Sequence, residues 1–149
     1  MSYSAGEVSK KLGLSKDALR YYEKEGLLPA IKRDPSGHRA FSESDVEWIF
    51  LIKCLRDTDM PIFKIKQYVS LLKDRGENSI LERREILLEH DAYITEKIAT
   101  YQSLSQLIKK KLDYFNASLS ADRPDSAKCM DYAAEWEQFR TTLGGIQYD

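Results

Sequence analysis

The first third of the chain alternates short apolar segments with turn-forming residues, a pattern that predicts two short helices. Ser4 and Ser15 occupy positions suited to helix N-caps, and Gly13 separates the two segments. A serine oxygen can accept a hydrogen bond from a free amide of the first helical turn, and glycine readily adopts the left-handed conformation that ends a helix. We therefore predict one helix from Ser4 to Gly13 and a second from Ser15 to about Glu25, together forming a helix-turn-helix.

The residues after the second helix predict a β-hairpin. Pro29 ends any helix, and the segment 34–37 reads Asp-Pro-Ser-Gly, with proline and glycine where a type I turn prefers them. The flanking segments 30–33 and 38–41 are long enough for two short strands. We predict that this hairpin forms a wing beside the helix-turn-helix.

Two further helices are predicted between the wing and residue 75. Ser42 can cap a helix that continues to about Arg56 and carries a wide apolar stripe, which indicates burial on more than one side. A break at residues 57–61 precedes a fourth helix. Its apolar residues recur at helical spacing, namely Ile62, Ile65, Tyr68, Val69 and Leu72.

Beyond residue 79 the apolar pattern changes to a repeat of seven. One row consists of Ile80, Leu87, Ile94, Tyr101, Ile108 and Phe115, and a second of Ile98, Leu112 and Leu119. A single helix over 80–119 would be about 60 Å long, at about 1.5 Å per residue. A domain of this size cannot bury such a helix alone, so we expect a second copy of the chain to pack on it. A helix folded back on its own chain is the alternative.

The last thirty residues predict a short helical tail. A breaker at residues 121–125 precedes an amphipathic segment from Ser126 to Leu143, which ends at two glycines. Its apolar residues could cap the coiled coil, pack against the wing domain or line a ligand site. The pattern leaves these three alternatives open.

Composition and charge narrow the class of protein. The 149 residues are 42% hydrophobic and 32% charged, which fits one or two small domains and excludes a large multidomain enzyme. The net charge is −1, but residues 1–41 hold eight basic and five acidic residues and so carry +3, leaving −4 on the rest. This polarity favours the first third of the chain for contact with a polyanion.

The reactive and metal-ligating residues are few and scattered. Cys54 and Cys129 do not have the spacing of a disulfide framework or a zinc site, and His38 and His90 lie in different segments. We therefore expect no metal and no cofactor. The sequence shows neither a secretory signal pattern nor a membrane-spanning apolar run, so we expect a soluble cytoplasmic protein without membrane contact.

The second helix carries groups suited to a DNA groove. Lys16, Arg20 and Tyr21 share a face on which a guanidinium could bind guanine edges or phosphate, while the ammonium and phenol groups bind phosphates. Arg33 and Arg39 flank the hairpin turn and could reach the DNA backbone beside the groove. An ordinary solvated helix face is the alternative, and the presence of the wing favours the DNA interpretation.

Three segments together resemble the mercury-resistance-regulator (MerR) family of bacterial transcription factors. They are LSKDALRYYEKEGLLP at 14–29, GHRAF at 37–41 and SESDVEWIFLIKCLRDTDMPIFKIK at 42–66. The resemblance implies a mainly α fold: a winged helix-turn-helix DNA-binding domain over 1–75, a dimerisation helix forming an antiparallel coiled coil over 76–119, and a C-terminal tail over 120–149. Asp59 replaces a common glycine, and we expect it to adopt the left-handed turn.

The same resemblance implies a transcriptional regulator rather than an enzyme. Such a homodimer binds double-stranded promoter DNA, and an effector makes it distort the spacer so that RNA polymerase can use the promoter. Carried over by position, the DNA-binding residues are Ser15, Lys16, Arg20, Tyr21, Arg33, His38 and Arg39. The dimerisation residues are Ile94, Ile98, Tyr101, Ile108, Leu112, Phe115 and Leu119.

The effector remains open at the level of sequence. Cys54 resembles a cysteine of aldehyde- and electrophile-responsive relatives, and nearby Lys53 and Arg56 could favour its thiolate, which would make the protein a stress-response regulator. Alternatively Cys54 fills space in the core. An organic ligand held by the coiled coil and tail is a further alternative. A coiled-coil adaptor that does not bind DNA is the competing function.

Overall fold

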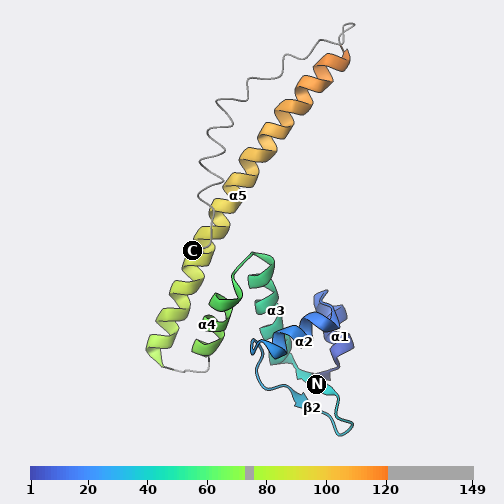
Figure 1. Cartoon of the computed structure of the whole chain (residues 1–149), viewed down its shortest axis with the longest axis vertical. Helices are drawn as coiled ribbons and strands as arrows, with labels where there is room; N and C mark the ends of the chain where they lie inside the picture. The colour runs from blue at the N-terminus through green and yellow to red at the C-terminus, as the bar shows by residue number, and fades with distance from the viewer. Residues whose placement is uncertain (73–75, 121–149) are drawn as a thin grey trace. The chain divides into compact units, whose positions relative to one another are not determined.

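The computed structural model describes residues 1–72 and 76–120 (Figure 1). The chain forms two compact units, the first spanning Met1–Leu88 and the second beginning at Glu89. The elements in chain order are β1 (Ser2–Tyr3), α1 (Ala5–Leu12), α2 (Lys16–Lys24), β2 (Lys32–Arg33), β3 (Arg39–Ser42), α3 (Glu43–Asp57), α4 (Ile62–Leu72) and α5 (Glu77–Ser120). The predicted mainly α class with a winged helix-turn-helix and a long helix is confirmed.

Three serines cap the helices of the first unit, as their positions predict. The Ser4 hydroxyl accepts a hydrogen bond from the Glu7 amide at 3.3 Å, and the Glu7 carboxylate accepts one from the Ser4 amide at 2.8 Å. Ser42 forms the same reciprocal pair at the start of α3, and Ser15 accepts from the Ala18 amide at 3.0 Å at the start of α2. These bonds satisfy amides that a helix end leaves free.

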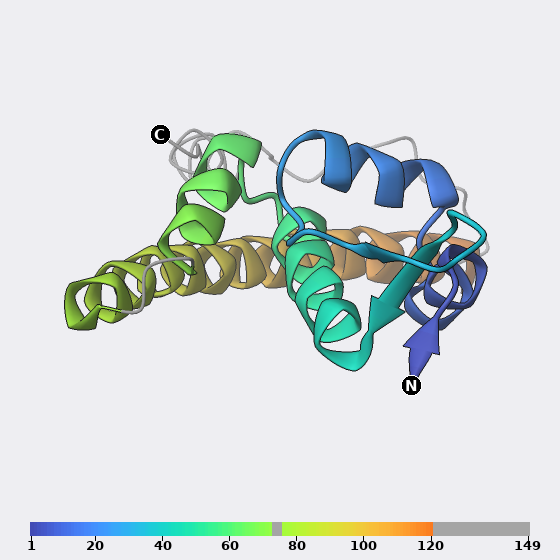
Figure 2. The same ribbon diagram turned by 90° about the horizontal axis from the view of Figure 1, so that it is seen from below.

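The wing is part of a three-stranded antiparallel sheet with the order β1-β3-β2. The Gly37 amide donates to the Asp34 carbonyl at 2.9 Å, which closes the predicted turn between β2 and β3. Figure 2 shows this hairpin beside the helices of the first unit. Strand β1, which pairs Tyr3 with Phe41, was not anticipated because two residues carry no periodic signal.

The core of the first unit joins the helix-turn-helix to α3 and α4. The Trp48 ring nitrogen donates to the Leu27 carbonyl at 2.8 Å and so fixes the segment after α2 on α3. Tyr22 is 6% exposed whereas Tyr21 is 41% exposed, so the two tyrosines face opposite sides of α2. The fully buried side chains include Val8, Leu27, Phe41, Ile49, Ile52, Met60 and Ile65.

The turn between α3 and α4 depends on Asp59. Its φ angle is +66°, the left-handed conformation expected where glycine is common, and the Met60 amide donates to the Leu55 carbonyl at 2.9 Å. Asp is one of the few residues other than glycine that adopts this conformation readily. The turn therefore forms without glycine and places Met60 in the core.

Helix α5 has 44 residues and begins at Glu77, three residues before the apolar repeat predicts. At about 1.5 Å per residue it is about 66 Å long. In the first unit the Ser79 hydroxyl donates to the Leu71 carbonyl, joining the end of α4 to the start of α5. The predicted tail helix over 126–143 lies outside the described residues. None of the helices over 1–72 and 76–120 has the length and apolar character to cross a membrane.

Candidate nucleic-acid interface

The exposed face of α2 carries the groups predicted to contact DNA. Arg20 is exposed, and its Nη1 lies 3.1 Å from the carboxylate of Asp17, one turn earlier. Lys16 begins the helix and is also exposed, with Ser15 immediately before it at the cap. Because the Ser15 oxygen accepts the capping bond, its hydroxyl hydrogen is the group that remains for an external acceptor.

The wing presents two basic side chains at its tip. The Arg33 Nη1 donates to the Gly37 carbonyl at 2.9 Å, which ties its guanidinium across the turn. His38 is exposed, and its Nδ1 lies 3.7 Å from the Asp34 carboxylate. These contacts restrain the guanidinium of Arg33 and the imidazole of His38 at the tip, and both side chains stay exposed to solvent.

Arg39 joins the wing to α2. Its Nε donates to the Glu23 carboxylate at 2.5 Å, and both side chains are about a third exposed. A charge-assisted bond of this kind restrains both partners more strongly than a bond between neutral groups. Arg39 therefore lines the candidate interface and also fixes the wing against α2, a structural role that the sequence pattern did not distinguish from DNA contact.

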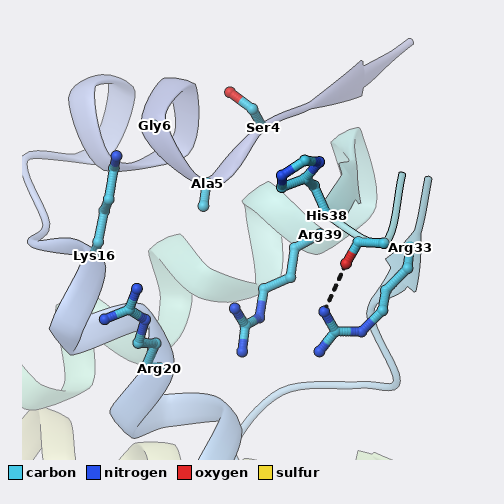
Figure 3. A pocket seen from close by; sticks show the side chains of 9 residues that line it. Ser4, Ala5, Gly6, Lys16, Arg20, Arg33, His38 and Arg39 are labelled. Carbon is cyan, nitrogen blue, oxygen red and sulfur yellow. Dashed lines mark hydrogen bonds between the residues drawn. The ribbon is translucent and has the colours of Figure 1, made fainter. Parts of the chain in front are cut away.

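A cavity of about 410 Å³ brings these elements together (Figure 3). It is lined by five of the seven predicted DNA-binding residues, by the start of α1 with its cap, and by Gly37 of the wing turn. The lining residues are Ser4, Ala5, Gly6, Lys16, Arg20, Arg33, Gly37, His38 and Arg39. Ser15 and Tyr21 are not among the lining residues. The cavity walls carry four permanent positive charges and no carboxylate among the lining residues, so the cavity is electrostatically suited to an anion.

The first turn of α1 is the part of this cavity that sequence reasoning missed. Ser4, Ala5 and Gly6 carry no charged side chain, and the sequence pattern used Ser4 only as a cap. Gly6 is the sequence feature that could have indicated this part of the cavity. Glycine is less favourable than alanine within a helix, so a helical glycine can mark a place where another group approaches the backbone.

Cys54, the predicted effector-sensing residue, lies on α3 and is half-buried with a free thiol. The preceding Lys53 donates to Asp57, and this bond raises the pKa of the Lys53 ammonium. The nearest cation in sequence is therefore held by a carboxylate. Cys129 lies outside the described residues.

The predicted dimerisation residues lie on α5. Six of them are large apolar side chains with exposed fractions between 48% and 85%: Ile98, Tyr101, Ile108, Leu112, Phe115 and Leu119. Ile94 is half-buried. The six share one face because residues three, four and seven apart in a helix align. A single chain thus exposes an apolar row from Ile98 to Leu119, along most of the described part of its second unit.

Comparisons with known proteins agree with this architecture. The model of the MerR HTH family of regulatory proteins matches residues 3–72. An HTH-type transcriptional regulator of Haemophilus influenzae is 32% identical over 115 residues, which cover 77% of this chain and 84% of that protein. The heavy metal-dependent transcription regulator 2 of Rhizobium meliloti is also 32% identical, covering 80% of this chain and 79% of its own length.

The fold is also similar to that of a relative whose structure was solved with bound DNA. The crystal structure of HiNmlR, a MerR family regulator lacking the sensor domain and bound to promoter DNA, superposes with a TM-score of 0.73 at 31% identity. The match covers 80% of this chain and 94% of that chain. The similarity therefore includes more than the helix-turn-helix.

Proposed function

Because the chain belongs to the MerR family of helix-turn-helix transcriptional regulators, we propose that it binds a promoter as a homodimer and distorts the DNA spacer in response to an effector. The observation that carries this proposal is the basic cavity between α2 and the wing. A helix that enters the major groove and a wing beside it would bring the cavity against the phosphate backbone.

The exposed apolar face of α5 supports the homodimer. At about 25 cal/mol per Å² of apolar surface removed from water, pairing such faces is strongly favourable. We propose residues 1–75 as the DNA-binding domain, 76–119 as the dimerisation helix and 120–149 as a further packing or effector region. RNA polymerase would then act on the distorted promoter.

For the effector we propose a reactive aldehyde or another electrophile that adds to Cys54. The half-buried thiol lies on α3, within the domain that would contact DNA, so adduct formation could alter the packing of that domain. The alternative is an organic ligand bound by the coiled coil and the tail. Metal dependence, named in the Rhizobium meliloti relative, is a further alternative, which the spacing of Cys54 and Cys129 in this chain does not favour.

DNA binding is tested with the duplex that adjoins the protein's own gene. We expect the affinity to fall steeply with salt, because each neutralised phosphate releases a counterion. Salt-independent binding of a protein partner, without affinity for any duplex, would instead support the coiled-coil adaptor.

The effector is tested by transcription in vitro with the wild type and Cys54→Ser, with and without formaldehyde or methylglyoxal. We expect the aldehyde to change transcription several-fold with the wild type and to have no effect with Cys54→Ser, while both proteins bind the promoter equally. An aldehyde response that survives in Cys54→Ser would contradict sensing by Cys54. No response in either protein would favour the organic ligand.

A further inference from the structure

Helix α5 has a second face, which is covered rather than exposed. From Thr100 to Ser120 six of its side chains are buried or half-buried, and every other side chain is exposed. The six recur at alternating steps of four and three residues, so they lie along one side of the helix. We call them the covered seam: Thr100, Leu104, Leu107, Lys111, Tyr114 and Ser118. None of them belongs to the exposed apolar row.

The burial of this seam within one chain indicates that another segment of the chain lies on it. Thr100 is 3% exposed, and the hydroxyl oxygen of Tyr114 is buried with no hydrogen-bond partner among the described residues. A lone helix covers the base of a tyrosine side chain but leaves its hydroxyl in water. In the second unit, which extends to Asp149, α5 is the only element that the structure describes. Residues 121–149 are the rest of that unit.

The sequence of the tail contains a run that fits the covered seam. Its members recur at alternating steps of three and four residues: Cys129, Tyr132, Trp136, Phe139 and Leu143. In a helix this spacing places all five on one side. The run from 129 to 143 and the seam from 104 to 118 have the same length, about 21 Å at about 1.5 Å per residue. The breaker at 121–125 has a length common for connections between antiparallel helices.

An antiparallel hairpin aligns the two runs over their whole length. The facing pairs are Ser118 with Cys129, Tyr114 with Tyr132, Lys111 with Trp136, Leu107 with Phe139, and Leu104 with Leu143. In this register the lysines at 109–111 face Glu135 and Glu137, which flank Trp136. Apolar groups and opposite charges therefore meet in the same alignment.

We infer that residues 126–143 fold back as a helix onto the covered seam of their own chain, with Ser118 beside Cys129 at one end and Leu104 beside Leu143 at the other. The tail is then a packing segment of the second unit. The exposed apolar row stays open for a second copy of the chain. This assignment goes beyond the proposed function and does not depend on DNA binding.

A disulfide to the native Cys129 tests the register in the whole chain. Ser118→Cys is combined with Cys54→Ser, so that Cys129 is the one native thiol left. Mild oxidation with copper phenanthroline should join positions 118 and 129 within one chain, as the mass of the linked peptides shows. Asn116→Cys in the same background is the control, because residue 116 is exposed and lies on the opposite side of α5. We expect Ser118→Cys to cross-link at least about tenfold faster.

Two results of this oxidation would overturn the assignment. A disulfide from position 118 to Cys129 of a second chain, which doubles the mass on a denaturing gel, would assign the covered seam to a second copy. Equal rates in Ser118→Cys and Asn116→Cys would show that the tail does not dock on the seam.

Trypsin cleavage of the tail measures the docking without an introduced thiol. Lys128 and Arg140 are the cleavage sites within 126–143. Leu107→Asp places a carboxylate in the seam opposite Phe139, and an unpaired buried charge opposes docking. We expect cleavage at these sites to be at least about tenfold faster than in the wild type, since proteolysis follows the population of the open form.

Gln106→Asp is the matched control for Leu107→Asp. Gln106 is exposed and lies outside both the covered seam and the apolar row. It should be cleaved at the wild-type rate, and sedimentation should show both variants to be dimeric, because neither changes the apolar row. Equal cleavage of the wild type and Leu107→Asp, or of the two variants, would contradict docking of the tail on this face.

Discussion

The side chains of Lys16 and Arg20 lie one turn apart on the same face of α2, but they differ in their partners. Arg20 bonds to Asp17 at 3.1 Å on an exposed surface, a pairing that contributes little and is readily exchanged for a DNA acceptor. Arg39 is held more firmly, because Glu23 accepts from its Nε in a partly shielded position. We therefore propose that Lys16 and Arg20 contact DNA and that Arg39 positions the wing.

Arg20→Ala should weaken promoter binding by about ten- to a hundredfold while leaving the dimer intact. A paired contact of arginine with a guanine edge is worth about 1–3 kcal/mol of discrimination, and the alanine removes it. Titration of the labelled duplex measures the affinity, and sedimentation measures the oligomeric state.

Arg84→Ala is the matched control for Arg20→Ala. Arg84 is an exposed arginine of α5 that pairs with Glu85, and it does not line the cavity. The two variants remove the same charge from different places. Equal losses in both would show that net charge, rather than a contact from α2, explains the effect of Arg20.

Between elements, carboxylates at the surface of the first unit form contacts that join one element to another. Glu43 at the start of α3 accepts from the Tyr3 hydroxyl at 2.6 Å, fixing β1 to α3, and Glu25 accepts from Lys66 of α4 at 2.8 Å. The bond from Tyr3 lowers the pKa of Glu43, the bond from Lys66 lowers that of Glu25, and the bond from the Ser4 amide lowers that of Glu7.

These lowered pKa values predict that the first unit loses stability in acid. A carboxyl whose pKa is lower in the folded than in the unfolded protein stabilises the fold above the ordinary value of 4.5. That contribution is lost as the pH falls from 4.5 through the lowered folded pKa. We expect the unfolding temperature to change little between pH 7 and pH 5.5 and to fall below about pH 4.5, as thermal denaturation would show.

The Glu43→Gln variant tests how much of the loss of stability in acid comes from the carboxylate of Glu43 at the start of α3. The variant should unfold at a lower temperature than the wild type at pH 7, and the difference should shrink at pH 3, where the wild-type carboxyl is protonated. Glu47→Gln is the control, because Glu47 is exposed on the same helix without a partner among the described residues. A difference for Glu43→Gln that is as large at pH 3 as at pH 7 would contradict the linkage.

For the whole molecule, we propose that dimerisation through the apolar face of α5 is required for promoter binding. A single helix-turn-helix supplies few phosphate and base contacts, whereas a dimer doubles them on two half-sites. The exposed row on α5 is far more apolar than a solvated helix requires, and a second copy of the chain would remove it from water.

Ile108→Asp combined with Leu112→Asp should break the dimer. Each dimer would have to bury four carboxylates in an apolar contact, so we expect the dissociation constant to rise at least about a hundredfold and promoter binding to be lost. Sedimentation equilibrium measures the first effect and duplex titration the second.

Ala99→Asp combined with Ser103→Asp is the control for the charge added to α5. Both residues are exposed, have the same spacing of four residues and lie away from the apolar row, since neither is three, four or seven residues from any of its members. This variant should remain dimeric. A variant at 108 and 112 that also remains dimeric would refute the assignment of the dimer contact.

Features that depend on neighbours along the chain could be predicted from the sequence. Cap serines, the turn at 34–37, the left-handed Asp59 and the repeat of seven act over three, four or seven residues, so spacing alone reveals them. The same locality predicted which residues share the exposed face of α2 and which share the apolar face of α5.

Which of these faces meet depends on how the helices and strands pack. Lys16 reaches the first turn of α1, and Arg39 bonds to Glu23 sixteen residues earlier, because the packing of the core orients α1, α2 and the wing around one cavity. Strand β1 forms because β3 offers an edge to two residues that have no pattern of their own. Such contacts depend on the summed geometry of several elements, which local spacing does not encode.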